Sequence, residues 1–423
     1  MSGQTIAQTV MRPIAAKERI ETLDVLRGFA IFGILIVNWA HDVHWEVAPW
    51  EGWTGAADQV TYWLIQFVAN EKFWPFFSFL FGLGFAIQME RLEARGVAIP
   101  KLYSRRLLVL FVIGAAHFIL AERDIVFRYA ILGFLLLLMR KWPARTLVLV
   151  AVICVLIPWT LNTWQGWQHE RRLADPATAT EAVREAAQRR TAENLARWGQ
   201  ADPDRTMATG SFGEIVALRA SWWWWEVSSW ESYVNWLGDP FPPFLLGLYV
   251  GRRRIFGNVS AHRRFIRRVM WWSLAIGLIG TIAFMLLLAA RDAPYLTRQG
   301  LKLLERFGSP ALAFFYICGL TLLLEKAAWK RRMQPLAAVG RMALTNYLLH
   351  SVAFVLLFFG YGLGLYGKVG AFGGFVLALP VLFLEVLLSL WWLKRFRFGP
   401  AEWLWRTLTY GKLQPMRVRQ VAG

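Results

Sequence analysis

The sequence predicts an all-α, polytopic membrane protein of about ten transmembrane helices, with both termini in the cytoplasm. Long apolar runs follow one another along the chain, and most approach the roughly 20 residues that a helix needs to cross a bilayer core. Short charged clusters separate the runs, and the excess of Lys and Arg, 47 against 28 Asp and Glu, falls in alternate loops. This alternation is the charge pattern of an inserted membrane protein.

The apolar runs place five expected spans in an N-terminal membrane half, 21–164, and five in a C-terminal half, 231–395. A long hydrophilic segment, 165–230, separates the halves, and polar tails, 1–20 and 396–423, flank them as cytoplasmic extensions. The expected spans are 25–40, 73–89, 107–120, 124–139, 147–164, 233–250, 269–290, 310–324, 343–359 and 372–393.

Loop charge orients these spans. The basic loops after spans two, four, six, eight and ten fall on the side of the basic N-terminus, which is the cytoplasmic side. The loop after span seven fits least well, because it also carries arginines. Segment 165–230 then lies outside, since long loops translocate largely regardless of charge. The sequence therefore predicts a multi-pass protein of the bacterial inner membrane, with the lipid bilayer as its partner. The net charge of +19 does not indicate a nucleic-acid partner, because no recognition motif accompanies it.

Local patterns predict how particular segments fold. Asp239 and three nearby prolines interrupt the sixth span, which is therefore broken or kinked. The outer segment contains a helical pattern, ATEAVREAAQRRTAENLARW, and Thr178 and Glu181 fit a capping box at its start. Gly82 and Gly84 in the second span permit close helix packing.

Polar residues at membrane depth are functional candidates, because a charge there costs several kcal/mol unless it is paired. Asp24 and Arg27 lie three residues apart, so they share a helical face and can form an ion pair with either a structural or a functional role. Asn38, at the outer end of the same span, is either a functional amide or a helix-packing amide. Asn346 lies on one face of the ninth span with His350, and packing is the favoured role there.

Three histidines lie near the expected outer face. His117 is close to the outer end of the third span and Asp124 opens the fourth, so the short connection predicts a hydrogen-bonded base with an orienting carboxylate. The alternative is a buried histidine satisfied by a neighbouring helix. His41 and His44 follow the first span, one helical turn apart. No metal is expected, because two ligands are too few and no Cys or further His joins them.

Five blocks of the sequence, in order, resemble the YeiB-like membrane proteins, long classed by domains of unknown function. The resemblance covers most of the chain, apart from the N-terminal tail and the long outer segment. The blocks are LDVLRGFAIFGILIVNW, KFWPFFSFLFGLGFA, GAAHFILAERDIVFRYAILG, FLLGLYVGR and GRMALTNYLLHS.

YeiB-like proteins are grouped with transmembrane acyltransferases, among them the lysosomal heparan-alpha-glucosaminide N-acetyltransferase. The resemblance implies transfer of an acyl group across the bilayer, from cytoplasmic acyl-CoA, in particular acetyl-CoA, to an acceptor on the far side. It matches Asn38 to an Asn that the heparan enzyme uses at the outer end of its first span. That enzyme's His in the next outer loop corresponds to His44 or His41, although these lie closer to Asn38 than the His lies to the Asn in the heparan enzyme. His117 with Asp124 instead matches the YeiB-like pattern.

These residues suit acyl transfer chemically. A neutral His removes the proton from an acceptor hydroxyl or amine as it attacks the thioester, and an amide such as Asn38 donates to the developing oxyanion. Cytoplasmic arginines would hold the phosphates of CoA, unless they serve only as determinants of orientation. The candidates for this role are Arg105, Arg106, Arg252 and Arg253.

The leading interpretation is an integral membrane acyltransferase that acts on an envelope glycan or a lipid headgroup. A transporter or exporter of a small anionic or amphipathic solute is the alternative, because interrupted helices such as the sixth span often line substrate sites. A non-catalytic membrane scaffold is a third possibility. The sequence leaves open the acyl group, the acceptor and whether the protein is a homo-oligomer.

Overall fold

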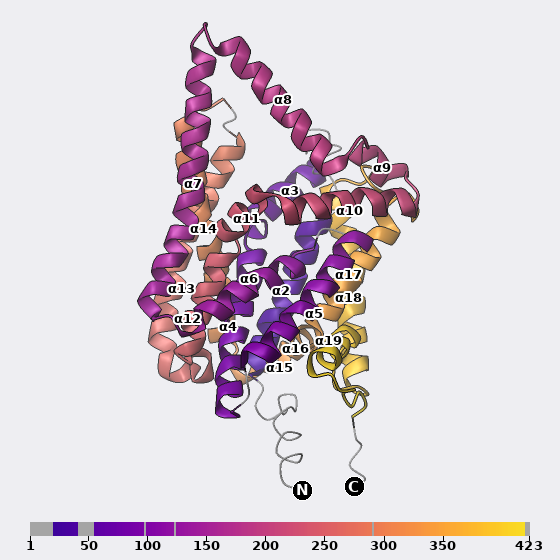
Figure 1. Ribbon diagram of the computed structural model, residues 1–423. Coiled ribbons are helices and arrows are strands. Elements are labelled where there is room, and N and C mark those ends of the chain that lie inside the picture. Colours follow the sequence, from indigo (N-terminus) through magenta and orange to yellow (C-terminus); the bar gives the residue numbers. More distant parts are fainter. Residues whose placement is uncertain (1–19, 41–54, 97–98, 122–123, 290–291, 419–423) are drawn as a thin grey trace, which may run out of the picture.

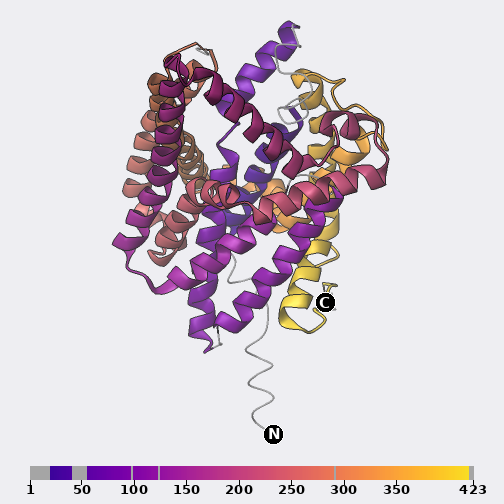
Figure 2. The ribbon, with the colours of Figure 1, turned by 45° about the horizontal axis from the view of Figure 1, so that its top comes forward.

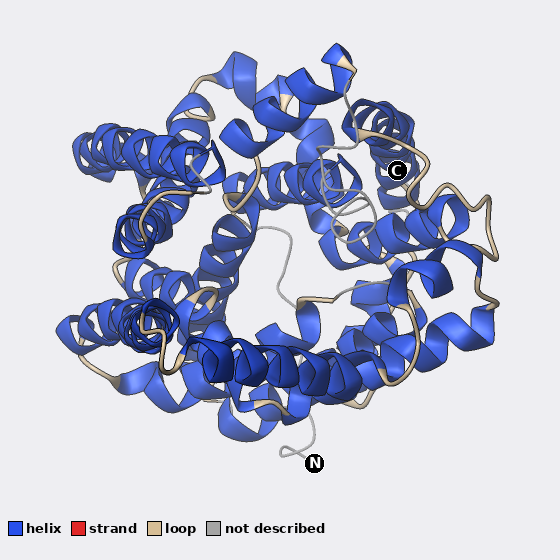
Figure 3. Cartoon of the chain, turned by 90° about the horizontal axis from the view of Figure 1, so that it is seen from above, coloured by secondary structure: helices blue, strands red, loops and turns tan. Residues whose placement is uncertain are grey.

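The computed structural model describes residues 20–40, 55–96, 99–121, 124–289 and 292–418. Over these residues every regular element is a helix, and the one extended pairing is an isolated bridge between Phe396 and Arg417. Seen from above, most helices stand side by side, and a few lie across their ends (Figure 3). The chain is thus an all-α, polytopic membrane protein, in which helices satisfy the backbone hydrogen bonds that lipid cannot.

The helices fall into three consecutive groups along the chain. The N-terminal group comprises α2 (Glu21–Ala40), α3 (Ala56–Val68), α4 (Phe73–Ala94), α5 (Ile99–Leu120), α6 (Val126–Leu138), the short η4 (Met139–Lys141) and α7 (Ala144–Ala174). The outer segment comprises α8 (Ala179–Trp198), α9 (Pro203–Thr209), α10 (Phe212–Ser228) and α11 (Trp230–Gly238). The C-terminal group comprises α12 (Phe241–Arg252), η5 (Ile255–Gly257), α13 (Val259–Ala289), α14 (Tyr295–Leu323), α15 (Ala327–Arg332), α16 (Gln334–Arg341), α17 (Ala343–Phe358), α18 (Ala371–Leu393) and α19 (Pro400–Tyr410).

Nine expected spans each coincide with a helix and the sixth covers α11 and α12, but length and apolarity reduce the number of candidate spans. Within the described residues, six helices are both long and apolar enough to cross a membrane, namely α2, α5, α7, α13, α14 and α18. A seventh span results if α16 and α17, which meet at 82°, form one broken span. Helices α6 and α12 have 13 and 12 residues, so each rises only about 20 Å against a core of about 30 Å. Helix α4 has 22 residues, but its Trp, Pro, Ser and Gln residues lower its mean hydropathy.

Three helices are longer than a bilayer requires. Helices α7, α13 and α14 have 31, 31 and 29 residues, so each is about 45 Å long. The spans expected from the sequence at these three helices are shorter, because they were bounded by apolar runs and the helices continue into polar residues. Helix α7 rises past its neighbours, and α8 descends from its tip to the outer end of the bundle (Figures 1 and 2). Only Ala182 and Trp198 of α8 are buried, as expected for a helix that bridges through solvent.

The start of α8 differs from the sequence-based prediction. Thr178 makes no capping hydrogen bond, because its hydroxyl donates to the Arg172 carbonyl at 2.8 Å in the α7–α8 turn. The predicted capping box at Thr178 and Glu181 is therefore wrong. A capping box occurs instead at α10, where Ser211 Oγ accepts from the Glu214 N–H and the Glu214 carboxylate accepts from the Ser211 N–H. The backbone hydrogen bond from Ser211 is the main reason that the pKa of Glu214 is lowered.

The predicted break in the sixth span is confirmed. Helix α11 ends at Gly238, and α12 begins at Phe241 after the break at Asp239. Pro240 precedes α12, and Pro242 and Pro243 lie in its first turn. Proline is tolerated there because the first N–H groups of a helix have no partner within the helix. The prolines therefore start a new helix rather than distort an existing one.

Close backbone contacts fix two helix pairs at the centre of the bundle. A Cβ added to Gly28 of α2 would lie 2.1 Å from a backbone oxygen of α16, and one added to Gly340 of α16 would lie 1.8 Å from a backbone oxygen of α2. A Cβ on Gly82 of α4 would lie 2.1 Å from a backbone oxygen of α12, as its predicted packing role requires. Gly84 faces a side chain instead, because the nearest atom to its added Cβ is a guanidinium nitrogen of Arg27 at 3.4 Å.

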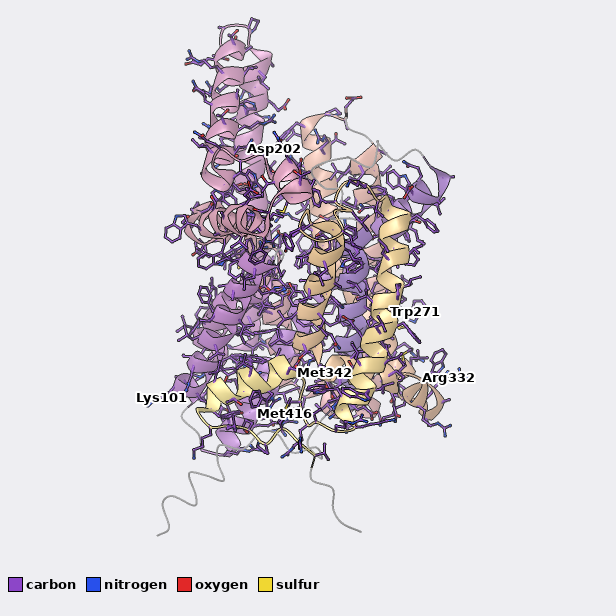
Figure 4. All side chains as sticks on the ribbon, turned by 90° about the vertical axis from the view of Figure 1, so that its right-hand side faces the viewer. Lys101, Asp202, Trp271, Arg332, Met342 and Met416 are labelled. Atoms are coloured by element: carbon purple, nitrogen blue, oxygen red, sulfur yellow. The ribbon has the colours of Figure 1, made fainter. Side chains whose placement is uncertain are left out.

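The two ends of the bundle differ in charge. Lys101, Arg332 and Met416 lie at one end, and Asp202 lies toward the other (Figure 4). Helices α15 and α19 lie at the first end, and α8 and α9 at the second (Figure 1). The first is called the basic end below, and the second the outer end. The positive-inside rule predicts that the basic end faces the cytoplasm.

Candidate functional site

His117 of α5 and Asp124, just before α6, form the buried pair that their spacing predicts. His117 Nδ1 lies 2.6 Å from Asp124 Oδ2, and the other carboxylate oxygen accepts a hydrogen bond from the Phe127 N–H at 2.9 Å. His117 is 8% exposed and Asp124 is 1% exposed. The carboxylate keeps the proton of a neutral ring on Nδ1, so Nε2 is an acceptor. Among the described residues Nε2 has no hydrogen-bond partner, which leaves it oriented as a base.

A glycine makes this pair possible. A Cβ added to Gly114, one turn before His117, would lie 2.4 Å from the backbone nitrogen of Phe127 and 2.8 Å from Asp124 Oδ1. Helices α5 and α6 can therefore approach this closely only where α5 has no side chain. The hydrogen bond depends on this packing as well as on the short connection between the two helices.

An inner cavity of about 270 Å³ extends from the basic end into the bundle. Its lining follows α2 from Ile20 to Ile34, a rise of about 21 Å. Asp24 and Glu402 are the carboxylates among its lining residues. Its lining arginines come from five different helices and are Arg27, Arg91, Arg106, Arg341 and Arg406. The inner cavity therefore carries an excess of positive charge.

An outer cavity of about 480 Å³ lies toward the opposite end. Its lining carboxylates outnumber its arginines, and amides and indole rings complete the wall. The carboxylates are Glu71, Asp124, Glu226 and Asp239, and the arginines are Arg128 and Arg197. The amides are Asn38, Asn70 and Asn235, and the indoles are Trp74, Trp222, Trp225 and Trp236. This wall is polar and aromatic, with an excess of negative charge.

Ion pairs and hydrogen bonds hold the carboxylates of the outer cavity in place. Arg128 lies 2.8 Å from Glu226, which also accepts a hydrogen bond from the Trp236 indole at 3.0 Å. Glu71 accepts from the Trp74 indole at 2.6 Å. The wall is thus preorganised by contacts between α6, α10 and α11 and by a local contact at the start of α4.

The two cavities meet at the level of the histidine–carboxylate pair. Ile34, Ile125, Tyr129 and Tyr347 line both of them. The ring of Tyr347 lies 5.3 Å from that of His117, centroid to centroid. Asp124 lines the outer cavity, whereas His117 is not among the lining residues of either cavity. Tyr347 therefore lies against the histidine and lines both cavities.

The structure places several of the predicted residues around these cavities. Asn38 lines the outer cavity together with Asp124. The predicted ion pair between Asp24 and Arg27 is present, at 3.0 Å, and both residues line the inner cavity. His41 and His44 lie outside the described residues, so their catalytic role stays a prediction.

Two predicted packing residues belong to a polar contact between α17 and α18. Asn346 donates to the Val339 carbonyl at 3.1 Å and to Ser389 Oγ at 3.0 Å. His350 Nε2 lies 2.8 Å from the carboxylate of Glu385, a partner that the sequence analysis missed. A single acid within an apolar span was the available signal, because such a charge needs a partner.

The arginines predicted to bind phosphate do not all lie at the inner cavity. Arg106 lines the inner cavity, but Arg105, Arg252 and Arg253 are exposed and lie outside its lining. Arg252 instead donates to the Trp142 carbonyl at 2.5 Å. No local pattern distinguishes the arginines that do converge, because their convergence depends on how distant helices pack. Those that the sequence analysis missed are Arg91, Arg341 and Arg406.

Several known proteins are similar to this chain over nearly its whole length. The family model described as "Protein of unknown function (DUF418)" matches residues 250–412. The uncharacterized protein YxaH of Bacillus subtilis is 33% identical over 428 residues, covering 96% of this chain and 98% of the relative. The uncharacterized protein YeiB of Escherichia coli is 27% identical over 400 residues, covering 93% and 96%. An uncharacterized 39.9 kDa protein from the amylase 3′ region of Bacillus acidopullulyticus is 26% identical over 423 residues, covering 97% and 100%.

The relatives match nearly the whole chain, so the likeness includes both membrane halves and the outer segment between them. The family model alone runs from the end of α12 to the end of α19, and it includes Arg341, Tyr347 and Arg406 of the inner cavity. The histidine–carboxylate pair lies outside the matched residues of that model but within the span of the relatives' alignments. The chain therefore belongs to the YeiB-like, DUF418 family of membrane proteins.

Proposed function

We propose that this protein is an integral membrane acyltransferase of the bacterial inner membrane. It takes an acyl group from acyl-CoA at the cytoplasmic, basic end and transfers it to a hydroxyl or amine acceptor in the outer cavity. The acceptor is an envelope glycan or a lipid headgroup. The observation that carries this proposal is the meeting of two cavities of opposite charge beside a buried base.

The opposite charge of the cavities supports different occupants. Five arginines against two carboxylates favour a polyanionic donor such as acyl-CoA in the inner cavity. Four carboxylates against two arginines disfavour an anion in the outer cavity. Indoles, amides and carboxylates together suit a hydroxyl-rich or amine-bearing acceptor, because they offer apolar faces, donors and acceptors. Each reactant thus approaches the junction from its own side.

His117 would act as the general base. The acceptor reaches Nε2 past Tyr347, and its oxygen or nitrogen attacks the thioester carbonyl while Nε2 takes its proton. Asp124 stabilises the resulting imidazolium through Nδ1, and Asn38 donates to the oxyanion. When the carbon–sulfur bond breaks, the imidazolium returns the proton to the CoA thiolate. The products are the acylated acceptor and free CoA.

Turnover of labelled acetyl-CoA tests this proposal. The protein in nanodiscs is incubated with acetyl-CoA labelled in the acetyl group and with amine-bearing or hydroxyl-bearing glycans and lipids. We expect acceptor-dependent release of CoA and a labelled acceptor. His117→Gln should reduce the rate at least about 100-fold, the usual contribution of a general base.

A second histidine provides the matched control. His169 lies near the outer tip of α7 and lines neither cavity, so His169→Gln should retain the wild-type rate. The acyltransferase proposal fails if acyl-CoA neither binds nor turns over with any acceptor. It also fails if His117→Gln and His169→Gln turn over equally well.

A transporter is the second candidate, because two helix breaks lie at the cavities. Asp239 and Pro240, between α11 and α12, line the outer cavity. The 82° bend between α16 and α17 lies at the inner cavity, where Arg341 and Ala343 are lining residues. Interrupted helices often form transporter substrate sites. Counterflow of a labelled solute by proteoliposomes, without acyl transfer, would favour this candidate.

A further inference from the structure

The inner cavity gathers guanidinium groups that are distant in the sequence. The five arginines lie on α2, α4, α5, α16 and α19, and each of them is half-buried. A charge inside a low-dielectric protein is costly unless it is balanced, and clefts lined by one sign of charge concentrate ions of the opposite sign. Among the described lining residues, five guanidinium groups share the wall with two carboxylates. The excess charge therefore points to an anionic ligand.

Both carboxylates already have partners. Asp24 Oδ1 accepts from an Arg27 guanidinium nitrogen at 3.0 Å. Glu402 Oε1 accepts from the backbone nitrogens of Leu344 and Thr345 at 2.7 and 3.2 Å, and its Oε2 accepts from Thr345 Oγ1 at 2.6 Å. Glu402 thus serves the N-terminus of α17, whereas Asp24 pairs with Arg27.

Helix packing explains how two of the arginines come to line the same cavity. Gly28 and Gly340 let α2 and α16 touch through their backbones, and Arg27 and Arg341 are their neighbours in the sequence. Gly84 of α4 presents no side chain to Arg27, which leaves room for the guanidinium group. Glycines in three helices therefore shape the space in which these arginines lie.

The C-terminal helix α19 supplies another wall of the cavity. The Arg106 guanidinium lies 3.7 Å from the centroid of the Trp405 ring, and the Trp405 indole donates to the Arg106 carbonyl at 2.9 Å. Arg406 follows Trp405 and also lines the cavity. The stacked pair holds Arg106 in one orientation and attaches α19 to α5. The cavity is consequently built from both ends of the chain.

We propose that the inner cavity is a binding site for a pyrophosphate group, held by Arg27, Arg91, Arg106, Arg341 and Arg406. Guanidinium groups bind phosphate oxygens in a bidentate manner, and several of them match a group with multiple charges better than a single carboxylate. The pyrophosphate belongs to CoA or to a nucleoside diphosphate. Assigning CoA as the source rests on the proposed acyl transfer, whereas the site itself does not require it.

Ligand binding to the intact protein in nanodiscs tests the site. Calorimetric titrations compare CoA, ADP and inorganic pyrophosphate with pantetheine, which lacks phosphate. We expect all three phosphate ligands to bind and pantetheine to bind at least tenfold more weakly. Tighter binding of CoA than of ADP would assign the source to CoA, and the reverse order would assign it to a nucleotide.

Arginine variants locate the binding site. Arg406→Gln and Arg341→Gln should each weaken pyrophosphate binding about 10- to 100-fold, because a hydrogen bond to a charged group contributes about 1.5–3 kcal/mol. Arg406→Lys should recover only part of the affinity, since it keeps the charge but loses the bidentate geometry. Arg105→Gln and Arg253→Gln remove the same charge from outside the cavity and should bind as the wild type does.

The outcomes separate this site from the proposed function. Pyrophosphate binding that depends on Arg341 and Arg406, without acyl transfer, supports the site and contradicts the acyltransferase. Acyl transfer that is unchanged in Arg341→Gln and Arg406→Gln supports the acyltransferase and overturns the site. Pantetheine binding as tight as CoA binding also overturns it. Melting temperatures of each variant without ligand distinguish lost binding from lost folding.

Discussion

At the scale of single residues, the proposed chemistry depends on the arrangement of His117 and Asp124. The carboxylate accepts from His117 Nδ1 and from the Phe127 N–H, so it is fixed on both sides. A fixed carboxylate selects the ring tautomer in which Nε2 is free to accept a proton. The close approach at Gly114 maintains this geometry without a flexible connection.

Asp124→Asn tests the role of the carboxylate. The amide keeps the acceptor for Phe127 but presents an N–H group to Nδ1, which favours the opposite tautomer and removes the lone pair from Nε2. We expect the rate of acyl transfer to fall about 10²- to 10⁴-fold with little change in the affinity for CoA. Initial rates and CoA titrations measure the two effects.

An exposed aspartate serves as the control for this change. Asp175, in the α7–α8 turn, accepts a backbone hydrogen bond from Ala177 and lines neither cavity. Asp175→Asn should leave both rate and affinity unchanged. An unchanged rate in Asp124→Asn would show that the pair is only structural.

At the scale of elements, α19 is attached to the start of α17 through one side chain. Glu402 accepts three hydrogen bonds from Leu344 and Thr345, and the Ala401 N–H donates to Thr345 Oγ1 at 3.1 Å. The first N–H groups of a helix lack partners within the helix, so Glu402 caps α17 from another element. Tyr347, at the junction of the cavities, lies less than one turn further along α17.

Glu402→Ala should release α19 from this position. Leaving a buried donor unsatisfied costs about 1–3 kcal/mol, so we expect a lower melting temperature and faster proteolysis of the C-terminal segment. Affinity for CoA should fall as well, because α19 carries Arg406. Glu402→Gln keeps one acceptor oxygen and should lie between Glu402→Ala and the wild type. Equal proteolysis of all three proteins would contradict this role for Glu402.

At the scale of the whole molecule, the charge difference between the two ends predicts the orientation in the membrane. The basic end carries α15 and α19, and the outer end carries the arm of α7 and α8 (Figure 1). The positive-inside rule predicts that the former faces the cytoplasm. In this orientation, the inner cavity faces the compartment that holds the proposed donor, acyl-CoA.

Cysteine labelling in intact cells tests this orientation. After Cys154 and Cys318 are replaced by Ser, Thr180→Cys on α8 should react with a membrane-impermeant maleimide. Ala327→Cys on α15 should react only after the membrane is permeabilised. Both positions are exposed, so access to solvent does not distinguish them. The reverse labelling pattern would put the inner cavity outside the cytoplasm and contradict its proposed use of cytoplasmic acyl-CoA.

The sequence predicted the features that depend on local chemistry. Apolar runs predicted the helical membrane fold, Asp239 and its prolines predicted the break before α12, and a short connection predicted the contact of His117 with Asp124. The sequence predicted about ten spans, whereas six or seven of the described helices are long and apolar enough to be candidates. Helices α6 and α12 are too short to cross a bilayer alone, and polar residues lower the hydropathy of α4. Hydropathy reports the composition of a segment but does not show where a helix ends.

What the sequence alone determined was therefore the class of fold, the expected orientation and one buried pair, because each follows from residues close together in the chain. The tertiary structure decided which arginines share a cavity. Arg106 lines it while its neighbour Arg105 does not, and Arg341 and Arg406 enter it from distant helices. Side chains from separate helices converge only through packing, such as the contact of Gly28 with α16, and no local pattern specifies that contact.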